Sequence, residues 1–174
     1  MFKERCRGTL TTLPFKRHPR RVIIETVHFT ALWRNVVPSK VGISQLYSPR
    51  EILTGTYLDY NKHCVLDFGE YVEVHDEPSP LNGMTSRTRP CIALGPTGNL
   101  QGTHKFMDIN TGRLLKKRSW TRIPMPDTVI KKVEQRAEKE KRDGILRFRN
   151  RKNEKFDWDE GLDEALDCPT ANEI

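Results

Sequence analysis

The chain has 174 residues, enough for one ordinary domain or two small ones, and its 36% hydrophobic content and mean hydropathy of −0.67 fall below those of one fully packed globule. No apolar run approaches the ~20 residues of a membrane span, and the first residues lack the apolar centre of a secretory signal, so we expect a soluble, intracellular protein with no membrane partner. Residues 154–174 hold eight acidic residues and one lysine (−7), whereas residues 1–153 hold 29 basic and 15 acidic residues (+14), which predicts a polyanion as the partner of the basic part.

Three helices are predicted in the first third of the chain. The first covers residues 1–12 and has no capping residue before its first turn. The second opens at Pro19, a residue suited to the first helical position, and its apolar rhythm continues to about Val37. The third begins at Ser48 with a capping box, in which the serine and a glutamate three residues later satisfy free backbone N–H groups, and it ends at Gly55 with a left-handed cap.

Short runs of strand-favouring residues alternate with glycine turns between residues 68 and 124, which predicts a small antiparallel β-domain. The first run alternates apolar and polar residues, as a half-buried strand does, and a polar loop follows it over residues 76–89. Turn-forming sequences at residues 95–99 and 110–112 separate the later strands. The sequence itself supports four strands, and the apolar contacts of the last one are Leu114, Leu115 and Trp120.

A further helix is predicted to begin at an Asp127 cap and to run to about Arg142. Its apolar stripe is limited to Ile130, Val133 and Ala137, so we expect a mostly solvated linker helix. Charges of the same sign stand four positions apart along it, which disfavours the helix slightly. The acidic end beyond it is too poor in large apolar residues to fold alone and is predicted to be disordered.

The cysteines and histidines give no pattern of a metal or catalytic site. No two cysteines have zinc-finger spacing, so all four are interpreted as reduced thiols: Cys6, Cys64, Cys91 and Cys168. The adjacent His63 and Cys64 would point to opposite faces of a strand, which makes them poor joint metal ligands. Residues 95–99 lack the Gly-Lys-Ser/Thr ending and the following helix of a phosphate-binding loop, so a hairpin turn is the better interpretation.

Several short motifs follow one another in a distinctive order and spacing. They are Trp33–Ser39, Ser48–Gly55, Phe68-Gly69, Arg89–Gly95 and Gly102–Gly112. Together they resemble the region of a copia-type LTR retrotransposon polyprotein that lies just after the integrase catalytic core. The resemblance covers most of the chain, from residue 1 to about residue 150.

The resemblance implies an α+β fold in four parts. Residues 1–64 are then a helical remnant of an RNase-H-like integrase core, and residues 65–125 a small SH3-like antiparallel β-barrel of five strands. Residues 126–144 form the linker helix and residues 145–174 the disordered acidic tail. The implied function is that of an integrase fragment in DNA integration, located in the nucleus or in a cytoplasmic particle.

Integrases of this family use two Asp and one Glu that bind two divalent metals for strand transfer. The matching helix register places that Glu about seven residues, or two helical turns, before Glu4. Asp59 and Asp67 follow Glu4 and belong to another segment. The resemblance therefore implies that the chain lacks the catalytic carboxylates and is no enzyme on its own. It also implies no cofactor, since Mg or Mn would belong to the missing core.

Three basic clusters are predicted to contact the DNA or RNA backbone weakly and without sequence preference, because long cationic side chains reach phosphates and release counterions. The third cluster surrounds a tryptophan that we expect to be exposed and to stack on an unpaired base. The members are Lys3, Arg5 and Arg7; Lys16, Arg17, Arg20 and Arg21; and Lys116, Lys117, Arg118, Trp120 and Arg122. The competing interpretation of each cluster is a solvated charged face.

Three other functions fit the same sequence. The first alternative is a nucleic-acid-binding module retained by a host cell. The second is a multimerisation element that binds intact integrase without a nucleic-acid role, and the third is an inactive translated relic. Salt-dependent binding to duplex DNA is the mark of the first, and a size measurement tests the second.

Overall fold

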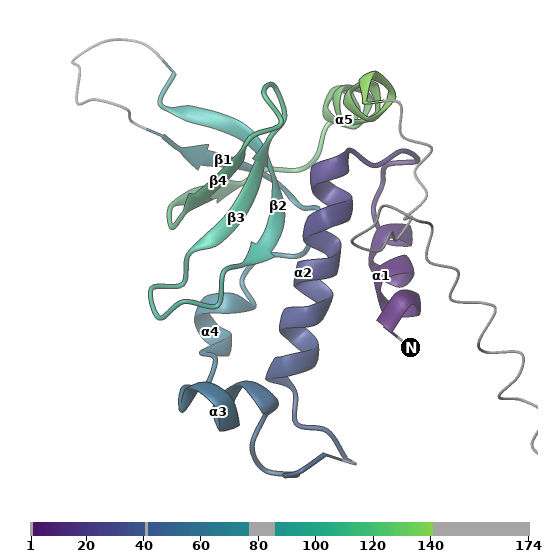
Figure 1. Ribbon diagram of the computed structural model, residues 1–174. Coiled ribbons are helices and arrows are strands. Elements are labelled where there is room, and N and C mark those ends of the chain that lie inside the picture. Colours follow the sequence, from purple (N-terminus) through teal and green to yellow (C-terminus); the bar gives the residue numbers. More distant parts are fainter. Residues whose placement is uncertain (1, 41, 77–85, 141–174) are drawn as a thin grey trace, which may run out of the picture. The chain divides into compact units, whose positions relative to one another are not determined.

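The computed structural model describes residues 2–40, 42–76 and 86–140, and the predicted acidic tail lies outside these ranges. The helices are α1 (Phe2–Thr11), α2 (Arg20–Val36), α3 (Pro49–Thr54), α4 (Tyr60–His63) and α5 (Asp127–Lys139) (Figure 1). The strands are β1 (Tyr71–His75), β2 (Thr88–Pro96), β3 (His104–Asp108), β4 (Leu114–Lys117) and β5 (Trp120–Arg122). The fold class is α+β, as predicted.

The helices before the sheet form largely where the sequence predicts them. α1 and α2 are present, although Pro19 caps α2 from the position before its first helical residue. The capping box of α3 is confirmed, because Ser48 accepts a hydrogen bond from the Glu51 backbone and Glu51 accepts one from the Ser48 backbone. Gly55, at φ 67°, provides the left-handed cap. α4 is a single turn that the sequence did not reveal, and Asp59 caps it.

The strands form one antiparallel sheet in the order β4-β3-β2-β1-β5, and the sheet is not closed. The predicted single last strand is wrong, because residues 114–122 divide into β4 and β5 on opposite edges. β4 continues the hairpin with β3, whereas β5 pairs with β1. The break at Arg118 and Ser119 lets the chain cross from one edge to the other, and the Ser119 carbonyl accepts a hydrogen bond from the His75 backbone N–H at 3.2 Å.

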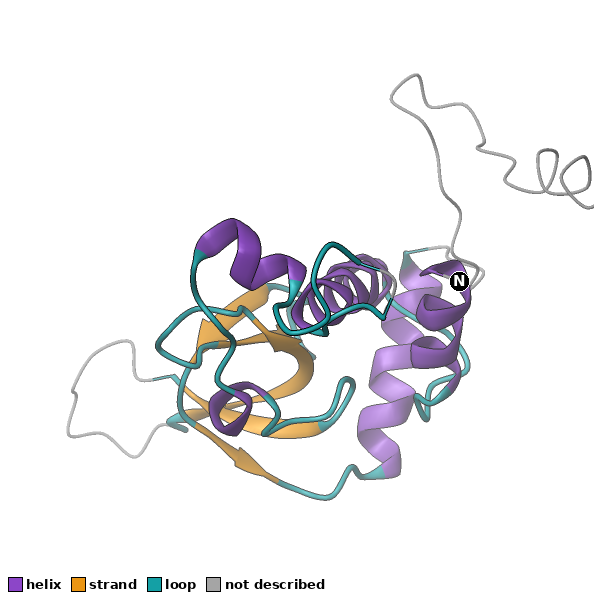
Figure 2. Cartoon of the chain, turned by 90° about the horizontal axis from the view of Figure 1, so that it is seen from below, coloured by secondary structure: helices purple, strands orange, loops and turns teal. Residues whose placement is uncertain are grey.

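β2 is buried on both faces of the sheet, unlike the half-buried β1. One face belongs to a cluster around Phe106, here called the Phe106 cluster: Leu66, Val72, Val74, Cys91, Ala93 and Phe106, with Leu115 and Trp120 packed against it. The other face packs against α1, α2 and α5 in a helix-side cluster that includes Leu10, Val22, Ile92, Met107 and Val133. Figure 2 shows the curved strands with these helices alongside. Burial of apolar surface on both faces fixes the register, because a one-residue slip would exchange the two clusters.

α5 packs against the sheet through a stripe as narrow as the sequence predicts. The buried residues are Val129, Val133 and Ala137, and Ile130 lies half-buried beside them. The stripe thus starts at Val129, an apolar residue that the prediction had not included. Pro126 occupies the cap position and makes no side-chain cap bond, so the predicted Asp127 cap is wrong.

Candidate nucleic-acid interface

The first basic cluster lies on the solvent side of α1. Cys6 and Leu10 are buried against the rest of the protein, which leaves Arg5 and Arg7 exposed and Lys3 half-buried. These cations project from a short helix.

α5 carries Glu134 and Glu138 on one flank of the buried stripe and Lys132 and Arg136 on the other. Successive residues of a helix are rotated by about 100°, so Glu134 and Glu138 lie on one side of Val133. Lys132 and Arg136 lie on the other side. Like charges four positions apart disfavour an isolated helix, but here each flank of α5 faces a different part of the protein. Tertiary contacts therefore explain this charge spacing.

The glutamate flank meets the start of α2, where the second predicted cluster lies. Glu134 accepts a hydrogen bond from the Lys16 backbone N–H at 2.8 Å, and Glu138 forms an ion pair with Arg17. Glu140 accepts from the Arg20 backbone N–H at 2.6 Å. No side chain of its own caps α2, so Glu140, which follows α5 directly, satisfies the first backbone N–H of α2 and opposes the positive end of its dipole.

The positive charge of the second cluster is therefore partly neutralised by carboxylates near α5. Arg17 is paired, and two further glutamates lie against the backbone of residues 16–20. Negative charge so close to these side chains lowers the potential that would attract a phosphate. The sequence separates these groups by more than a hundred residues, so no local pattern reveals the compensation.

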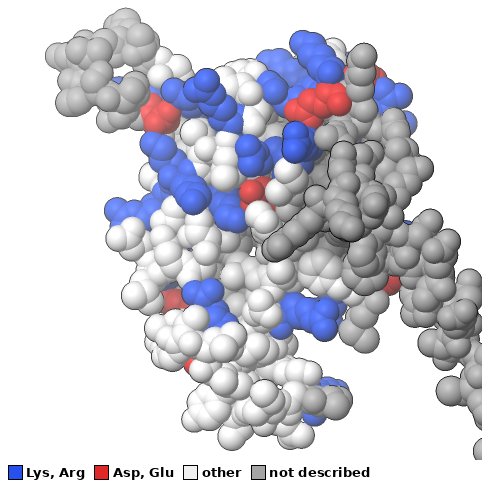
Figure 3. Space-filling view, viewed as in Figure 1, with Lys and Arg blue, Asp and Glu red and all other residues white. Residues whose placement is uncertain are grey.

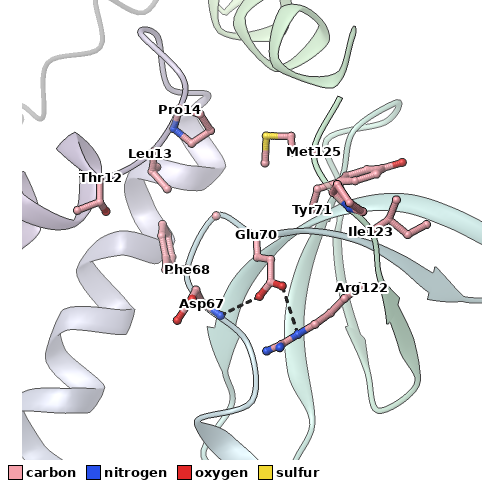
Figure 4. Close-up of a pocket in the computed structure, with 12 residues that line it drawn as sticks. Thr12, Leu13, Pro14, Asp67, Phe68, Glu70, Tyr71, Arg122, Ile123 and Met125 are labelled. Atoms are coloured by element: carbon pink, nitrogen blue, oxygen red, sulfur yellow. Dashed lines mark hydrogen bonds and ion pairs between the residues drawn. The ribbon is translucent and has the colours of Figure 1, made fainter. Parts of the chain in front are cut away.

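In the third cluster, two of the four cations are held by carboxylates. Lys117 pairs with Asp76 at 2.7 Å, and this interaction lowers the pKa of the Asp76 carboxyl. Arg122 pairs with Glu70 at 3.2 Å, and Glu70 also accepts from the Asp67 backbone N–H at 3.1 Å (Figure 4).

Arg122 and Glu70 stand at the rim of an apolar pocket of about 500 Å³. Its wall includes Leu13, Tyr71 and Met125 (Figure 4). Trp120 is half-buried and not exposed, with ring centroids 5.5 Å from Phe106 and 4.7 Å from His104. It supplies the apolar contacts that the sequence predicts for it, and its stacking on a base stays a prediction.

Several of the described cations without a carboxylate partner lie along the β4 edge and the basic flank of α5. Lys116 and Arg118 are exposed and form no ion pair within the described ranges. Arg113, also exposed, follows the β3–β4 turn. Lys116 stands opposite Lys105 in the register, on the sheet face that α2 and α5 cover, and Lys105 is itself neutralised by Glu25 at 2.8 Å.

Arg136 ties α5 to the β3–β4 turn. Its guanidinium donates hydrogen bonds to the carbonyls of Ile109, Asn110 and Thr111, at 3.3 Å to the first and 3.2 Å to the last. Lys132 and Lys139 line the same shallow crevice beside Asn110. We define the β4–α5 surface by its exposed cations: Arg113, Lys116, Lys132 and Lys139.

Figure 3 shows Lys and Arg side chains gathered over the part of this face formed by the sheet and α5, whereas the part formed by α3 is mostly without charge. Sequence reasoning assigned Lys132 and Lys139 to a solvated linker and omitted Arg113. The sequence pattern that could have revealed these lysines is the spacing of like charges four positions apart along α5, which separates acidic from basic residues on the helix surface.

The described residues include no group of three or more His, Cys, Asp or Glu side chains that could hold a metal ion. Cys6 and Cys91 are buried and Cys64 is exposed, while Cys168 lies outside the described ranges. Burial raises the pKa of the Cys91 thiol to about 12, and the nearby Asp108 adds to the increase. That thiol therefore stays protonated at physiological pH.

Three buried histidines predict that the protein loses stability as the solution becomes acidic. Burial lowers the pKa of His18, His63 and His104, and the proximity of His104 lowers that of His63 further. The unfolded chain takes up protons near pH 6.5 while these side chains stay neutral in the folded state, so stability falls as the pH drops below about 6.5. Urea unfolding is expected to give a lower free energy at pH 5.5 than at pH 7.5.

The matched variants are His104→Gln, which should weaken this pH dependence, and His75→Gln at an exposed position, which should leave it intact. Equal stability at both pH values in the parent would contradict the prediction.

Comparison of the chain with protein-family models, with curated proteins and with solved structures found no match. Among the described helices, none has both the length and the apolar character needed to cross a membrane.

Proposed function

We propose that the chain is the part of a copia-type integrase that follows the catalytic core, and that it holds the nucleic-acid backbone through the β4–α5 surface. The observation that carries this proposal is the distribution of ion pairs. Arg17, Lys105, Lys117 and Arg122 are each paired with a carboxylate, whereas the exposed cations of the β4–α5 surface have none within the described ranges. Exposed cations are the groups that exchange counterions for phosphates.

The strand order supports a finer assignment of the fold. A five-stranded sheet in the order β4-β3-β2-β1-β5, with a long bent central strand, is the order of an SH3-like barrel. β2 spans nine residues, and its pairing with β3 shifts register between Ala93 and Pro96. We assign the sheet as an open form of that barrel and α1 and α2 as the remnant of an RNase-H-like core.

The proposal gives this chain a holding role and no catalytic step. The residues that could be mistaken for the missing carboxylates are engaged otherwise. The Asp59 carboxylate caps α4, and the backbone of Asp67 donates to Glu70, although no contact of its own carboxylate is shown among the described residues. In the integrase assignment, Mg or Mn and the carboxylates that bind them belong to the core that precedes this region.

A salt titration on duplex DNA tests the proposed surface. We expect weak binding whose affinity falls from 50 to 200 mM salt, with the same affinity for unrelated sequences. Changing Arg113, Lys116 and Lys132 together to Gln should weaken binding and reduce the log–log salt slope by about one for each lost contact. Fluorescence anisotropy with a duplex of about 20 base pairs measures both quantities, and a single-stranded RNA of equal length compares DNA with RNA.

The control removes the same amount of charge elsewhere, with three exposed residues changed to Gln: Arg34 on α2, Lys40 in the loop between α2 and α3, and Lys62 on α4. This variant should keep most of the parent's salt slope. Equal loss in both variants would show that net charge alone drives binding, and absence of binding by the parent would favour an inactive relic.

A further inference from the structure

A cavity of about 340 Å³ lies between the start of α1 and the end of α2. The two helices run antiparallel and contact each other, so these two ends are neighbours (Figure 1). We call the cavity the Arg5–Arg34 pocket, and it shares no residue with the β4–α5 surface. Its wall combines two arginines, an amide, a hydroxyl and apolar side chains: Arg5, Arg34, Asn35, Ser39, Phe2 and Val37.

Two prolines fix the wall of this pocket. Val37 has an extended conformation, with φ −90° and ψ 127°, which the following proline favours, so α2 ends there. Pro49 begins α3 directly after its Ser48 cap. Because a proline ring fixes φ, Pro38 and Pro49 hold their part of the wall in one shape. The pocket is therefore built before any ligand arrives.

The positive charge of the pocket is not neutralised by the protein. Both arginines are exposed, and their guanidinium groups form no hydrogen bond or ion pair within the part of the chain that the structure describes. The one acidic residue on each helix is engaged elsewhere, since Glu4 is attracted to Arg7 and Glu25 pairs with Lys105 at 2.8 Å. No carboxylate belongs to the described lining of the pocket.

The pair of arginines favours a doubly charged anion. A phosphate monoester carries a charge of about −1.5 to −2 at pH 7, whereas a carboxylate carries only one negative charge. The planar fork of a guanidinium group also matches phosphate oxygens with paired hydrogen bonds. Asn35 and Ser39 supply further donors in the same cavity. The polar part of the pocket therefore suits a phosphate monoester.

The apolar part of the pocket suits an organic group attached to that phosphate. Phe2 is half-buried and Val37 is 54% exposed, so a ligand that covers them removes apolar surface from water. An aromatic side chain such as Phe2 also packs well against a planar ring. The volume of about 340 Å³ lies at the lower end of the roughly 300–1,000 Å³ of small-molecule sites. It has room for more than inorganic phosphate.

We infer that the Arg5–Arg34 pocket binds the phosphate monoester of a small organic molecule, with a mononucleotide as its representative ligand. The phosphate lies between the two arginines, and the planar group packs against Phe2 and Val37. This site goes beyond the proposed holding of the nucleic-acid backbone, because the backbone consists of diesters that carry one charge each. It also rests on residues that the β4–α5 surface does not contain.

Isothermal titration calorimetry of the full chain with adenosine 5′-monophosphate (AMP), in a buffer without phosphate, tests the pocket. The parent should bind AMP more tightly than inorganic phosphate, and adenosine, which lacks the phosphate, should not bind. Arg5→Gln with Arg34→Gln should raise the Kd for AMP by at least about tenfold, because hydrogen bonds to charged groups are lost. Both side chains are exposed, so the fold should be retained, and circular dichroism with a thermal melt checks this.

The matched control is Arg7→Gln with Arg118→Gln, which removes the same charge at exposed positions and should bind AMP like the parent. Val37→Ser should weaken AMP binding and leave the binding of inorganic phosphate unchanged. A parent that binds no AMP at up to about 10 mM overturns the inference. An equal loss of AMP binding in the double variant and in its control overturns it as well.

A phosphate monoester can come from a free nucleotide or from the 5′ end of a nucleic acid. A short 5′-phosphorylated oligonucleotide that displaces AMP, when its hydroxyl-ended form does not, identifies the nucleic-acid end as the source. Failure of both forms to displace AMP identifies a free small molecule, and either result supports the pocket. A duplex with hydroxyl ends contains no monoester, so its binding does not involve Arg34. The pocket and the β4–α5 surface therefore fail independently.

Discussion

Replacing Phe106 with alanine is expected to lower the free energy of unfolding by about 3–5 kcal/mol. The Phe106 side chain is fully buried, and its ring contacts Trp120 and His104 at centroid distances of 5.5 and 6.4 Å. It lies at the centre of the Phe106 cluster, to which all five strands contribute, so its removal leaves a cavity bounded by five strands. Urea unfolding followed by tryptophan fluorescence measures the loss.

A loss of this size approaches the total stability of a small domain, about 5–15 kcal/mol. Phe106→Leu, which keeps most of the volume, is therefore included and should lose about 1–1.5 kcal/mol. Leu100→Ala, at a residue 79% exposed, serves as the control and should change stability by no more than about 0.5 kcal/mol. Similar losses for Phe106→Ala and the control would contradict the assigned core.

Gly95→Ala is expected to destabilise the protein by about 2–4 kcal/mol, from two causes that add. Gly95 has φ 93°, a left-handed conformation that disfavours any residue with a Cβ. A Cβ at this position would also lie 2.5 Å from Cδ2 of Phe29, whose ring packs against Phe68 at 5.0 Å. The alanine must therefore move α2 away from β2 or displace this ring. The free energy of unfolding in urea again provides the measurement.

Gly55→Ala separates the two causes. Gly55 also has a positive φ, at 67°, but a Cβ there would have no neighbour within 4 Å. This variant should lose only about 1–2 kcal/mol. If both alanine variants lost the same free energy of unfolding, the close contact between Gly95 and Phe29 would not contribute to the loss.

Local chemistry allowed much of the fold to be predicted. The capping box at Ser48 and the left-handed cap at Gly55 were readable because capping involves residues only a few positions apart. The turn at residues 110–112 was readable because glycine and asparagine tolerate conformations that other residues avoid. The turn predicted at residues 95–99 begins later, because Gly95 and Pro96 still belong to β2. The narrow stripe on α5 was predicted from periodicity alone, although Val129 was overlooked.

The errors concern contacts between distant segments. Trp120 seemed exposed because basic residues surround it in the sequence, yet β5 pairs with β1 and turns the ring toward Phe106. Residues 114–122 seemed to form one strand because no strong breaker interrupts them, but the two halves pair with different strands.

The sequence by itself determined most of the helices, the turn at residues 110–112 and the excess of positive charge, because these depend on neighbouring residues or on composition. Only the tertiary structure decided which cations are neutralised. Glu138 and Arg17 meet across 121 positions, whereas Lys116 finds no carboxylate in the described ranges. An ion pair depends on the distance between two charges in space, and that distance is set by how α5 packs on the sheet.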